Sequence, residues 1–121
     1  MNDSIGFKCL HYSVAESGRS VKLTVLRKVE NEEFKFGIRT VDGTAKANAD
    51  YKPIDLEYTF KKREREAEKV FEVDIIDDNE WSPDLDFFAE LYDPEEKGEK
   101  ARYPGDDTRT KVTILDDDSP G

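Results

Sequence analysis

The chain has 121 residues, and 40% of them are charged: 29 Asp and Glu stand against 19 Lys and Arg, for a formal net charge of -10. This length fits a single domain spanning residues 1–121. The acidic balance argues against nucleic acid as a main partner, because an acidic surface repels phosphates. No apolar run approaches the roughly 20 residues of a membrane-spanning helix, so we expect no direct membrane insertion.

Alternation of apolar and polar residues with a period of two dominates the chain. Apolar Val21, Leu23 and Val25, for example, alternate with more polar neighbours. This pattern, rich in β-branched and aromatic residues, predicts half-buried strands. The predicted strands cover residues 5–14, 20–26, 34–39, 56–60, 71–75, 86–92 and 111–114.

The segments between these strands have the composition of turns, and Asp42-Gly43 is read as a turn only. The stretch Lys61–Lys69, KKREREAEK, has too few apolar residues to bury a helical face, so it is read as a charged connection. Seven short strands in one small domain predict an all-β fold: a seven-stranded antiparallel immunoglobulin-like β-sandwich.

Strand direction brings the acidic residues together. If each strand reverses the direction of the one before, the first, third, fifth and seventh strands end at the same end of the sandwich, which we call the acidic pole. Four segments far apart in the chain would deliver carboxylates to this pole. They are Glu16, Asp50, the pair Asp77 and Asp78, and the run Asp116, Asp117 and Asp118. The cationic stretch Lys61–Arg65 would lie at the opposite end.

Carboxylates gathered in this way repel one another. Two like charges about 4 Å apart repel by roughly 4 kcal/mol at an effective dielectric constant near 20. Hard oxygen ligands suit Ca²⁺, which takes about 6–8 of them at roughly 2.3–2.6 Å, whereas Zn²⁺ would need His or Cys. The residues alone leave two alternatives open: solvated acidic loops, or neutralisation by Arg19, Lys46 and Lys52 without any metal.

At these residues the chain resembles the Calx-β domain, a module of the regulatory cytoplasmic loop of sodium/calcium exchangers. The matching stretches run along nearly the whole chain in family order. They are Tyr12–Gly18, Arg39–Ala45, Ala49–Tyr51, Val73–Asp78, Phe87 with Leu91, and Thr110–Asp118.

The resemblance implies a Ca²⁺-binding regulatory module, a sensor, on the cytoplasmic side of a membrane protein. Its metal ligands would be Glu16, Asp50, Asp77, Asp78, Asp116, Asp117 and Asp118, with a backbone carbonyl that falls at Glu80 by position. The implied partners are the parent membrane transporter and an adjacent Calx-β domain in the same chain. Residues 115–121 would form an acidic C-terminal tail leading to that next domain.

Two departures from the family pattern limit this expectation. Ser82 and Leu85 stand where the fullest family site has ligand glutamates, although Asp84 or Asp86 could compensate. We therefore expect one or two ions, fewer than the fullest family site, or none. The alternative function is a Ca²⁺-independent structural or protein-interaction Calx-β domain of an adhesion or integrin-like protein.

Catalysis is not expected. His11 falls in a predicted strand with no nucleophile beside it, and it is expected to pack or to face solvent. Cys9, the only cysteine, excludes an internal disulfide and is read as a small buried apolar residue in the same strand.

Overall fold

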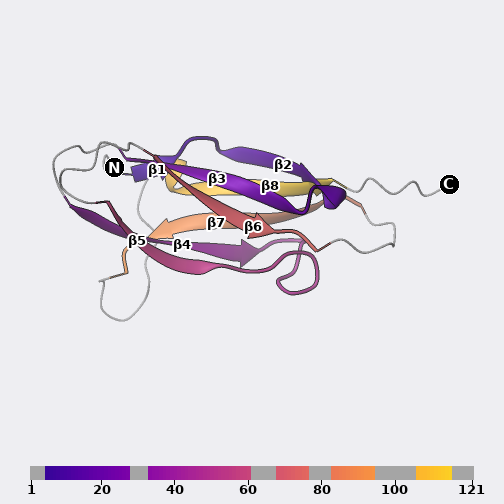
Figure 1. Cartoon of the computed structure of the whole chain (residues 1–121). Coiled ribbons are helices and arrows are strands. Elements are labelled where there is room, and N and C mark those ends of the chain that lie inside the picture. The colour runs from indigo at the N-terminus through magenta and orange to yellow at the C-terminus, as the bar shows by residue number, and fades with distance from the viewer. Residues whose placement is uncertain (1–4, 28–32, 61–67, 77–82, 95–105, 116–121) are drawn as a thin grey trace.

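A computed structural model of the chain describes residues 5–27, 33–60, 68–76, 83–94 and 106–115 (Figure 1). Within these ranges the regular secondary structure is almost entirely β-strand. The strands are β1 (Ile5–Phe7), β2 (His11–Ala15), β3 (Ser20–Arg27), β4 (Phe34–Asp42), β5 (Asp55–Phe60), β6 (Glu68–Asp74), β7 (Leu85–Tyr92) and β8 (Arg109–Leu115). Two short 3-10 helices, η1 (Glu16–Gly18) and η2 (Asp106–Thr108), complete the described elements.

The strands form two sheets packed as a sandwich. One sheet has three strands in the order β1-β3-β6, and the other has five in the order β2-β8-β7-β4-β5. The predicted all-β sandwich is therefore confirmed. All pairings between these named strands are antiparallel except that of β2 with β8, which is parallel.

The first predicted strand, residues 5–14, is wrong as a single element. β1 pairs with β3 in the smaller sheet, while β2 pairs with β8 in the larger one. The chain changes sheets between them: the Lys8 amide donates to the Thr24 carbonyl (2.8 Å), and the Leu10 carbonyl accepts from the Lys111 amide (3.1 Å). This change of sheet gives eight strands among the described residues instead of seven, and it leaves Cys9 exposed between two strands.

Two other boundaries also move. β4 continues three residues beyond its predicted end, to Asp42, and β6 begins at Glu68, inside the predicted connection 61–69. Residues 61–67, with the cationic stretch Lys61–Arg65, lie outside the described residues, so its expected place at the far end is untested. β5 ends and β6 begins on either side of it.

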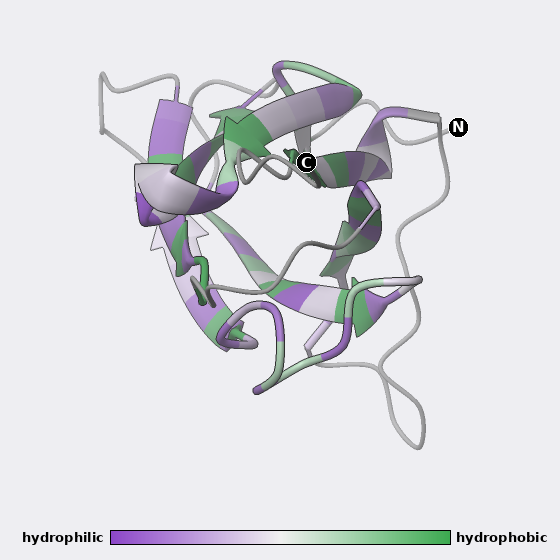
Figure 2. Ribbon diagram, turned by 90° about the vertical axis from the view of Figure 1, so that its right-hand side faces the viewer, coloured by the Kyte–Doolittle hydropathy of each residue, from purple (hydrophilic) through white to green (hydrophobic). Residues whose placement is uncertain are grey.

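The core lies between the two sheets and is rich in aromatic rings. Phe36 stacks on Phe60, with ring centroids 5.6 Å apart, and meets the edge of Phe71 at 5.9 Å. Nearer the acidic pole, Tyr51 stacks on Phe87 at 4.0 Å. Figure 2 looks onto this pole and shows hydrophobic and hydrophilic residues alternating along the strands. The period-two pattern of the sequence thus becomes one buried and one exposed face.

The predicted strand directions are confirmed. β2, β4, β6 and β8 all end at the same end of the sandwich, on the right of Figure 1, and β3, β5 and β7 begin there. This end is the acidic pole as defined from the sequence.

Replacing Phe36 with Ala tests the assignment of the core. The ring is fully buried, and its removal leaves a cavity among three other aromatic residues. We expect the free energy of unfolding to fall by about 3–5 kcal/mol in a urea titration. Leu10→Ala is the control, since Leu10 is 52% exposed and its loss should change stability by less than about 0.5 kcal/mol. Equal losses in the two variants would contradict the assignment.

Candidate functional site at the acidic pole

The structure describes two of the predicted ligand residues. Glu16 and Asp50 both lie at the acidic pole. The others lie outside the described residues: Asp77, Asp78, Glu80, Asp116, Asp117 and Asp118. The ligand set as a whole therefore stays a prediction. The described chain ends at Ile76 before the first group and at Leu115 before the last.

Backbone hydrogen bonds hold Ile75 and Ile76 between two other segments of the pole. The Ile75 amide donates to the Arg19 carbonyl (2.7 Å), and the Ile76 amide donates to the Asp50 carbonyl (3.0 Å). The chain that runs on to Asp77 thus leaves from between the turn that contains Glu16 and the loop that contains Asp50.

The parallel pairing of β2 with β8 brings in the fourth segment. Ala15 is the register partner of Leu115, so the chain that continues to Asp116 leaves from a point beside Glu16. The described residues that contain or lead into the four segments therefore lie at the same end of the sandwich, while the convergence of all their carboxylates stays a prediction.

Glu16 is a buried carboxylate, with 6% of its surface exposed. It begins η1, the short turn between β2 and β3, and Arg19 closes this turn with a φ of 70° in the left-handed region. Burying a carboxylate is costly unless polar groups or a cation surround it. The burial of Glu16 places a carboxylate at the acidic pole in a fixed position.

Asp50 is held within a compact loop. Its carboxylate accepts a hydrogen bond from the Lys46 amide (2.8 Å), and its own amide donates to the Lys46 carbonyl (2.9 Å). Asn48 has a φ of 69°, a left-handed conformation that Asn adopts more readily than most residues, and this lets the loop turn back. The position of the Asp50 carboxylate is thus fixed by local hydrogen bonds.

The sequence predicts only a turn at Asp42, but the carboxylate of this residue organises the loop before Asp50. One oxygen accepts hydrogen bonds from the Ala47 amide (2.9 Å) and from the Tyr51 hydroxyl (2.5 Å). The Tyr51 hydrogen bond lowers the pKa of Asp42 below its ordinary value. Burial raises the pKa of Tyr51, and the hydrogen bond to Asp42 raises it further. No sequence pattern marks this pair, because the contact exists only once the loop has closed.

At the start of β7, the side chains of Asp86 and Leu85 make contacts within the two sheets of the sandwich. The Asp86 carboxylate accepts a hydrogen bond from the Thr113 hydroxyl (2.7 Å) and lies 3.4 Å from the Lys111 ammonium. Leu85 is half-buried, packs against the core and pairs with Ile114. Leu85 therefore supplies packing where the family pattern has a ligand.

The donors at the pole fit a hard cation in their chemistry. Glu16 and Asp50 offer carboxylate oxygens, and Ca²⁺ prefers such ligands. Within the described residues alone, no three His, Cys, Asp or Glu side chains lie together in a way that could hold a metal ion. A complete site would accordingly need carboxylates from the segments after Ile76 and Leu115.

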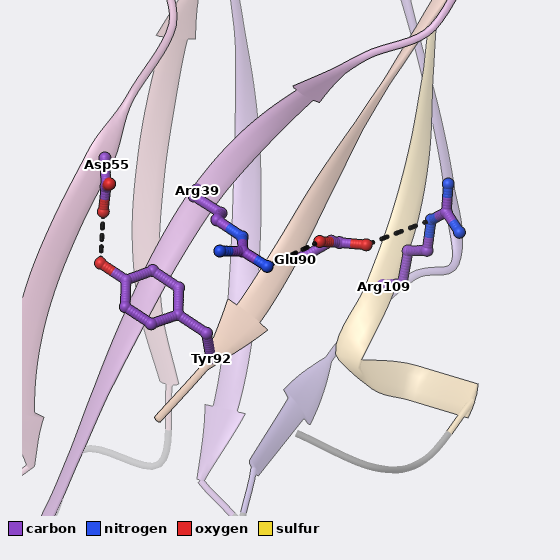
Figure 3. Close-up of polar contacts among 5 residues, drawn as sticks. All are labelled: Arg39, Asp55, Glu90, Tyr92 and Arg109. Atoms are coloured by element: carbon purple, nitrogen blue, oxygen red, sulfur yellow. Dashed lines mark hydrogen bonds and ion pairs between the residues drawn. The ribbon is translucent and has the colours of Figure 1, made fainter. Parts of the chain in front are cut away.

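A second polar cluster covers the outer face of the larger sheet (Figure 3). Glu90 lies between Arg39 (3.4 Å) and Arg109 (3.7 Å), and the Tyr92 hydroxyl donates to the Asp55 carboxylate. The Arg39 guanidinium also lies over the Tyr92 ring, 5.2 Å from its centroid. These charges are matched within the sheet, so we assign the cluster a structural role. On the same face, His11 is exposed and contacts the Thr113 hydroxyl.

Among the described residues, no helix is long and apolar enough to cross a membrane.

The fold and the pole together define a small β-sandwich module that has Glu16, Asp50 and the ends of β6 and β8 at one end. A profile of the Calx-beta domain family matches residues 1–118. The chain belongs to this family.

Similar proteins include sodium/calcium exchanger 1 of Felis catus, which is 31% identical over 126 residues. That match covers 91% of this chain but only 13% of the exchanger. The apo-form Calx CBD1 domain is 28% identical, with a TM-score of 0.79 over 95% of this chain and 97% of that one. The calcium binding domain CBD12 of CALX1.1 is 29% identical, with a TM-score of 0.80 over 97% of this chain and 47% of that one.

The raised pKa of Tyr51 predicts a loss of stability in alkali. Unfolded tyrosine ionises near pH 10.0, and folding raises the pKa of Tyr51, so above pH 10 the unfolded state binds fewer protons than the folded state. The free energy of unfolding should therefore fall as pH rises above 10, by up to about 1.4 kcal/mol per pH unit for one tyrosine. In urea titrations between neutral and alkaline pH, Tyr51→Phe should show a shallower fall than the wild type. If the free energy of unfolding fell equally steeply with pH in both proteins, ionisation of Tyr51 would not be the cause of the fall.

Proposed function

We propose that this domain is a Ca²⁺-binding regulatory module of a sodium/calcium exchanger cytoplasmic loop. The observation that carries the proposal is the junction at the acidic pole, where the Ile75 and Ile76 amides bond to the segments of Glu16 and Asp50. Membership of the Calx-beta family and the likeness to a structure described as a calcium binding domain support it.

The proposed ligands come from all four segments. They are Glu16, Asp50, Asp77, Asp78, the backbone carbonyl of Glu80, Asp116, Asp117 and Asp118. Glu16 and Asp50 stand on segments held by backbone hydrogen bonds, so they form the fixed part of the site. Bound Ca²⁺ would neutralise the mutual repulsion of these carboxylates. We propose one or two ions, because Leu85 supplies no donor.

Signalling would follow from the connection between the pole and the C-terminal tail. Leu115 pairs with Ala15, directly before Glu16, so the last described residue before the tail lies at the edge of the proposed site. Carboxylates of the tail that share an ion with Asp50 would fix the direction in which the tail leaves the domain. This would set the orientation of a following Calx-β domain and pass the signal to the parent transporter on the cytoplasmic side of the membrane.

Calorimetric titration of the domain with Ca²⁺ tests the proposal. We expect measurable heat of binding and a rise in the melting temperature at about 1 mM Ca²⁺. A free concentration 100 times the Kd would stabilise the fold by roughly 2.7 kcal/mol. If neither heat nor stabilisation appears, the Ca²⁺-independent interaction domain becomes the better assignment.

Substituting Asp50 tests the place of the site. Asp50→Asn removes one charge and keeps the shape of the side chain, and we expect it to raise the Kd for Ca²⁺ about tenfold, or ~1.4 kcal/mol. Glu68→Gln is the matched control, since Glu68 is exposed and begins β6 at the end opposite the acidic pole. It should leave the Kd unchanged. Equal effects of both substitutions would show that only the net charge matters.

A further inference from the structure

The hydrogen bonds of Asp42 suggest a role that extends beyond the loop itself. Asp42 ends β4 and is not among the proposed ligands. Its Oδ1 atom accepts from both the Ala47 amide and the Tyr51 hydroxyl, and so joins the end of β4 to both sides of the loop that contains Asp50.

Tyr51 is fixed at both ends of its side chain. Its ring is 0% exposed and stacks on Phe87 of β7, with centroids 4.0 Å apart and ring planes 12° from parallel. Its hydroxyl donates to Asp42 on β4. A residue held by the core and by a neighbouring strand has little freedom, and the residue before it in the chain, Asp50, shares that restriction.

The fixed position of Tyr51 also restricts the end of β6. The chain around Tyr51 forms a short antiparallel pairing with the end of that strand, with Tyr51 opposite Ile75. Hydrogen bonds flank this bridge on both sides: the Ile76 amide donates to the Asp50 carbonyl (3.0 Å), and the Lys52 amide donates to the Asp74 carbonyl (2.9 Å). The contact that fixes Tyr51 therefore also fixes the last described residue before Asp77.

We propose that Asp42 and Tyr51 are positioning residues of the ion site, which set the relative places of Asp50 and of Ile76, the last described residue before Asp77. This inference rests on the proposed function, Ca²⁺ binding at the acidic pole. Both residues act through others: the Asp42 carboxylate through the Tyr51 hydroxyl and the Ala47 amide, and Tyr51 through its pairing with Ile75.

A tyrosine-carboxylate hydrogen bond can also stabilise a fold without any role in a site. The chain offers a matched pair for this comparison. The Tyr92 hydroxyl donates to Asp55 on the outer face of the larger sheet (Figure 3), and Tyr92 is 1% exposed, as well buried as Tyr51. Tyr92 ends β7, which begins at the acidic pole and runs away from it.

The experiment compares Tyr51→Phe with Tyr92→Phe in the whole domain. Both substitutions remove one hydroxyl and leave ring and charge intact, so neither changes the electrostatic attraction of the pole for a cation. We measure the Kd for Ca²⁺ by calorimetry, the melting temperature without Ca²⁺, and the hydrogen-exchange rates of the Ile76 and Lys52 amides by NMR without Ca²⁺.

We expect Tyr51→Phe to raise the Kd about tenfold, as is typical when a residue that orients metal ligands is lost. It should also speed exchange at the Ile76 and Lys52 amides about tenfold, because local opening becomes easier. Tyr92→Phe should lower the melting temperature to a similar extent and leave both the Kd and these two exchange rates at their wild-type values.

The outcomes separate this inference from the function on which it rests. If the wild type binds Ca²⁺ and Tyr51→Phe binds it equally well, the positioning role is wrong and the proposed function stands. A tenfold rise in Kd for both variants would also overturn the positioning role, since general destabilisation would then explain it. If the wild type binds no Ca²⁺, the proposed function fails, and the role of Asp42 and Tyr51 in ion binding fails with it.

Discussion

The short pairing of Tyr51 with Ile75 is the contact on which the geometry of the acidic pole depends. A β-sandwich holds its two sheets together through side chains, and backbone hydrogen bonds normally stay within each sheet. Here the loop between β4 and β5, which belong to the larger sheet, bonds to the end of β6 in the smaller sheet. The two sheets are thus joined by the backbone at one end. That end carries the buried Glu16 and the hydrogen-bonded Asp50.

Charged side chains have more neighbours of opposite sign on the outer face of the larger sheet than in the sequence segments assigned to the pole. Across the larger sheet, one row of register partners alternates in sign, from Asp55 through Arg39 and Glu90 to Arg109. Opposite charges on neighbouring strands attract, so this row is compensated within the protein. The sequence segments gathered at the pole contain few cations, and Arg19, Lys46 and Lys52 are the nearest along the chain. The described row on the outer face is thus compensated by its own cations, whereas the carboxylates that the sequence assigns to the pole have few cations near them along the chain, which favours the proposed divalent cation.

The fold was largely predictable because alternation of apolar residues reports which face of a strand is buried. This signal placed six of the seven predicted strands and, with strand reversal, the acidic pole. It failed at residues 5–14, where the change of sheet depends on hydrogen bonds to Thr24 and Lys111, which no local pattern encodes. The available signal in the sequence was a change of phase, because the apolar residues stand at odd positions in Ile5 and Phe7 and at even positions in Leu10, Tyr12 and Val14.

The site was predictable only in outline. Strand direction indicates which segments meet, but a carboxylate that binds an ion and one that orders a loop look alike in a sequence. Asp42, which ends β4, and Asp50, a proposed ligand in the following loop, illustrate this, because nothing in the sequence separates them and each carboxylate accepts a backbone amide hydrogen bond in the structure. Only the structure shows that the oxygen of Asp42 already serves two donors, one of them a buried tyrosine.

The start of β7 bears directly on how many ions the pole would hold. Leu85 packs against the core, and its register partner Ile114 is buried, so this position contributes to the stability of the sandwich. Asp86 directs its carboxylate to Thr113 and Lys111, on the outer face of the larger sheet. The Asp86 carboxylate is not available as a ligand without breaking contacts that join β7 to β8, and the Leu85 side chain has no ligand atom. Each Ca²⁺ needs about six to eight oxygen ligands. If Leu85 and Asp86 of β7 supply none, the other segments of the pole must supply all of them. This is the physical reason for proposing one or two ions instead of a larger cluster.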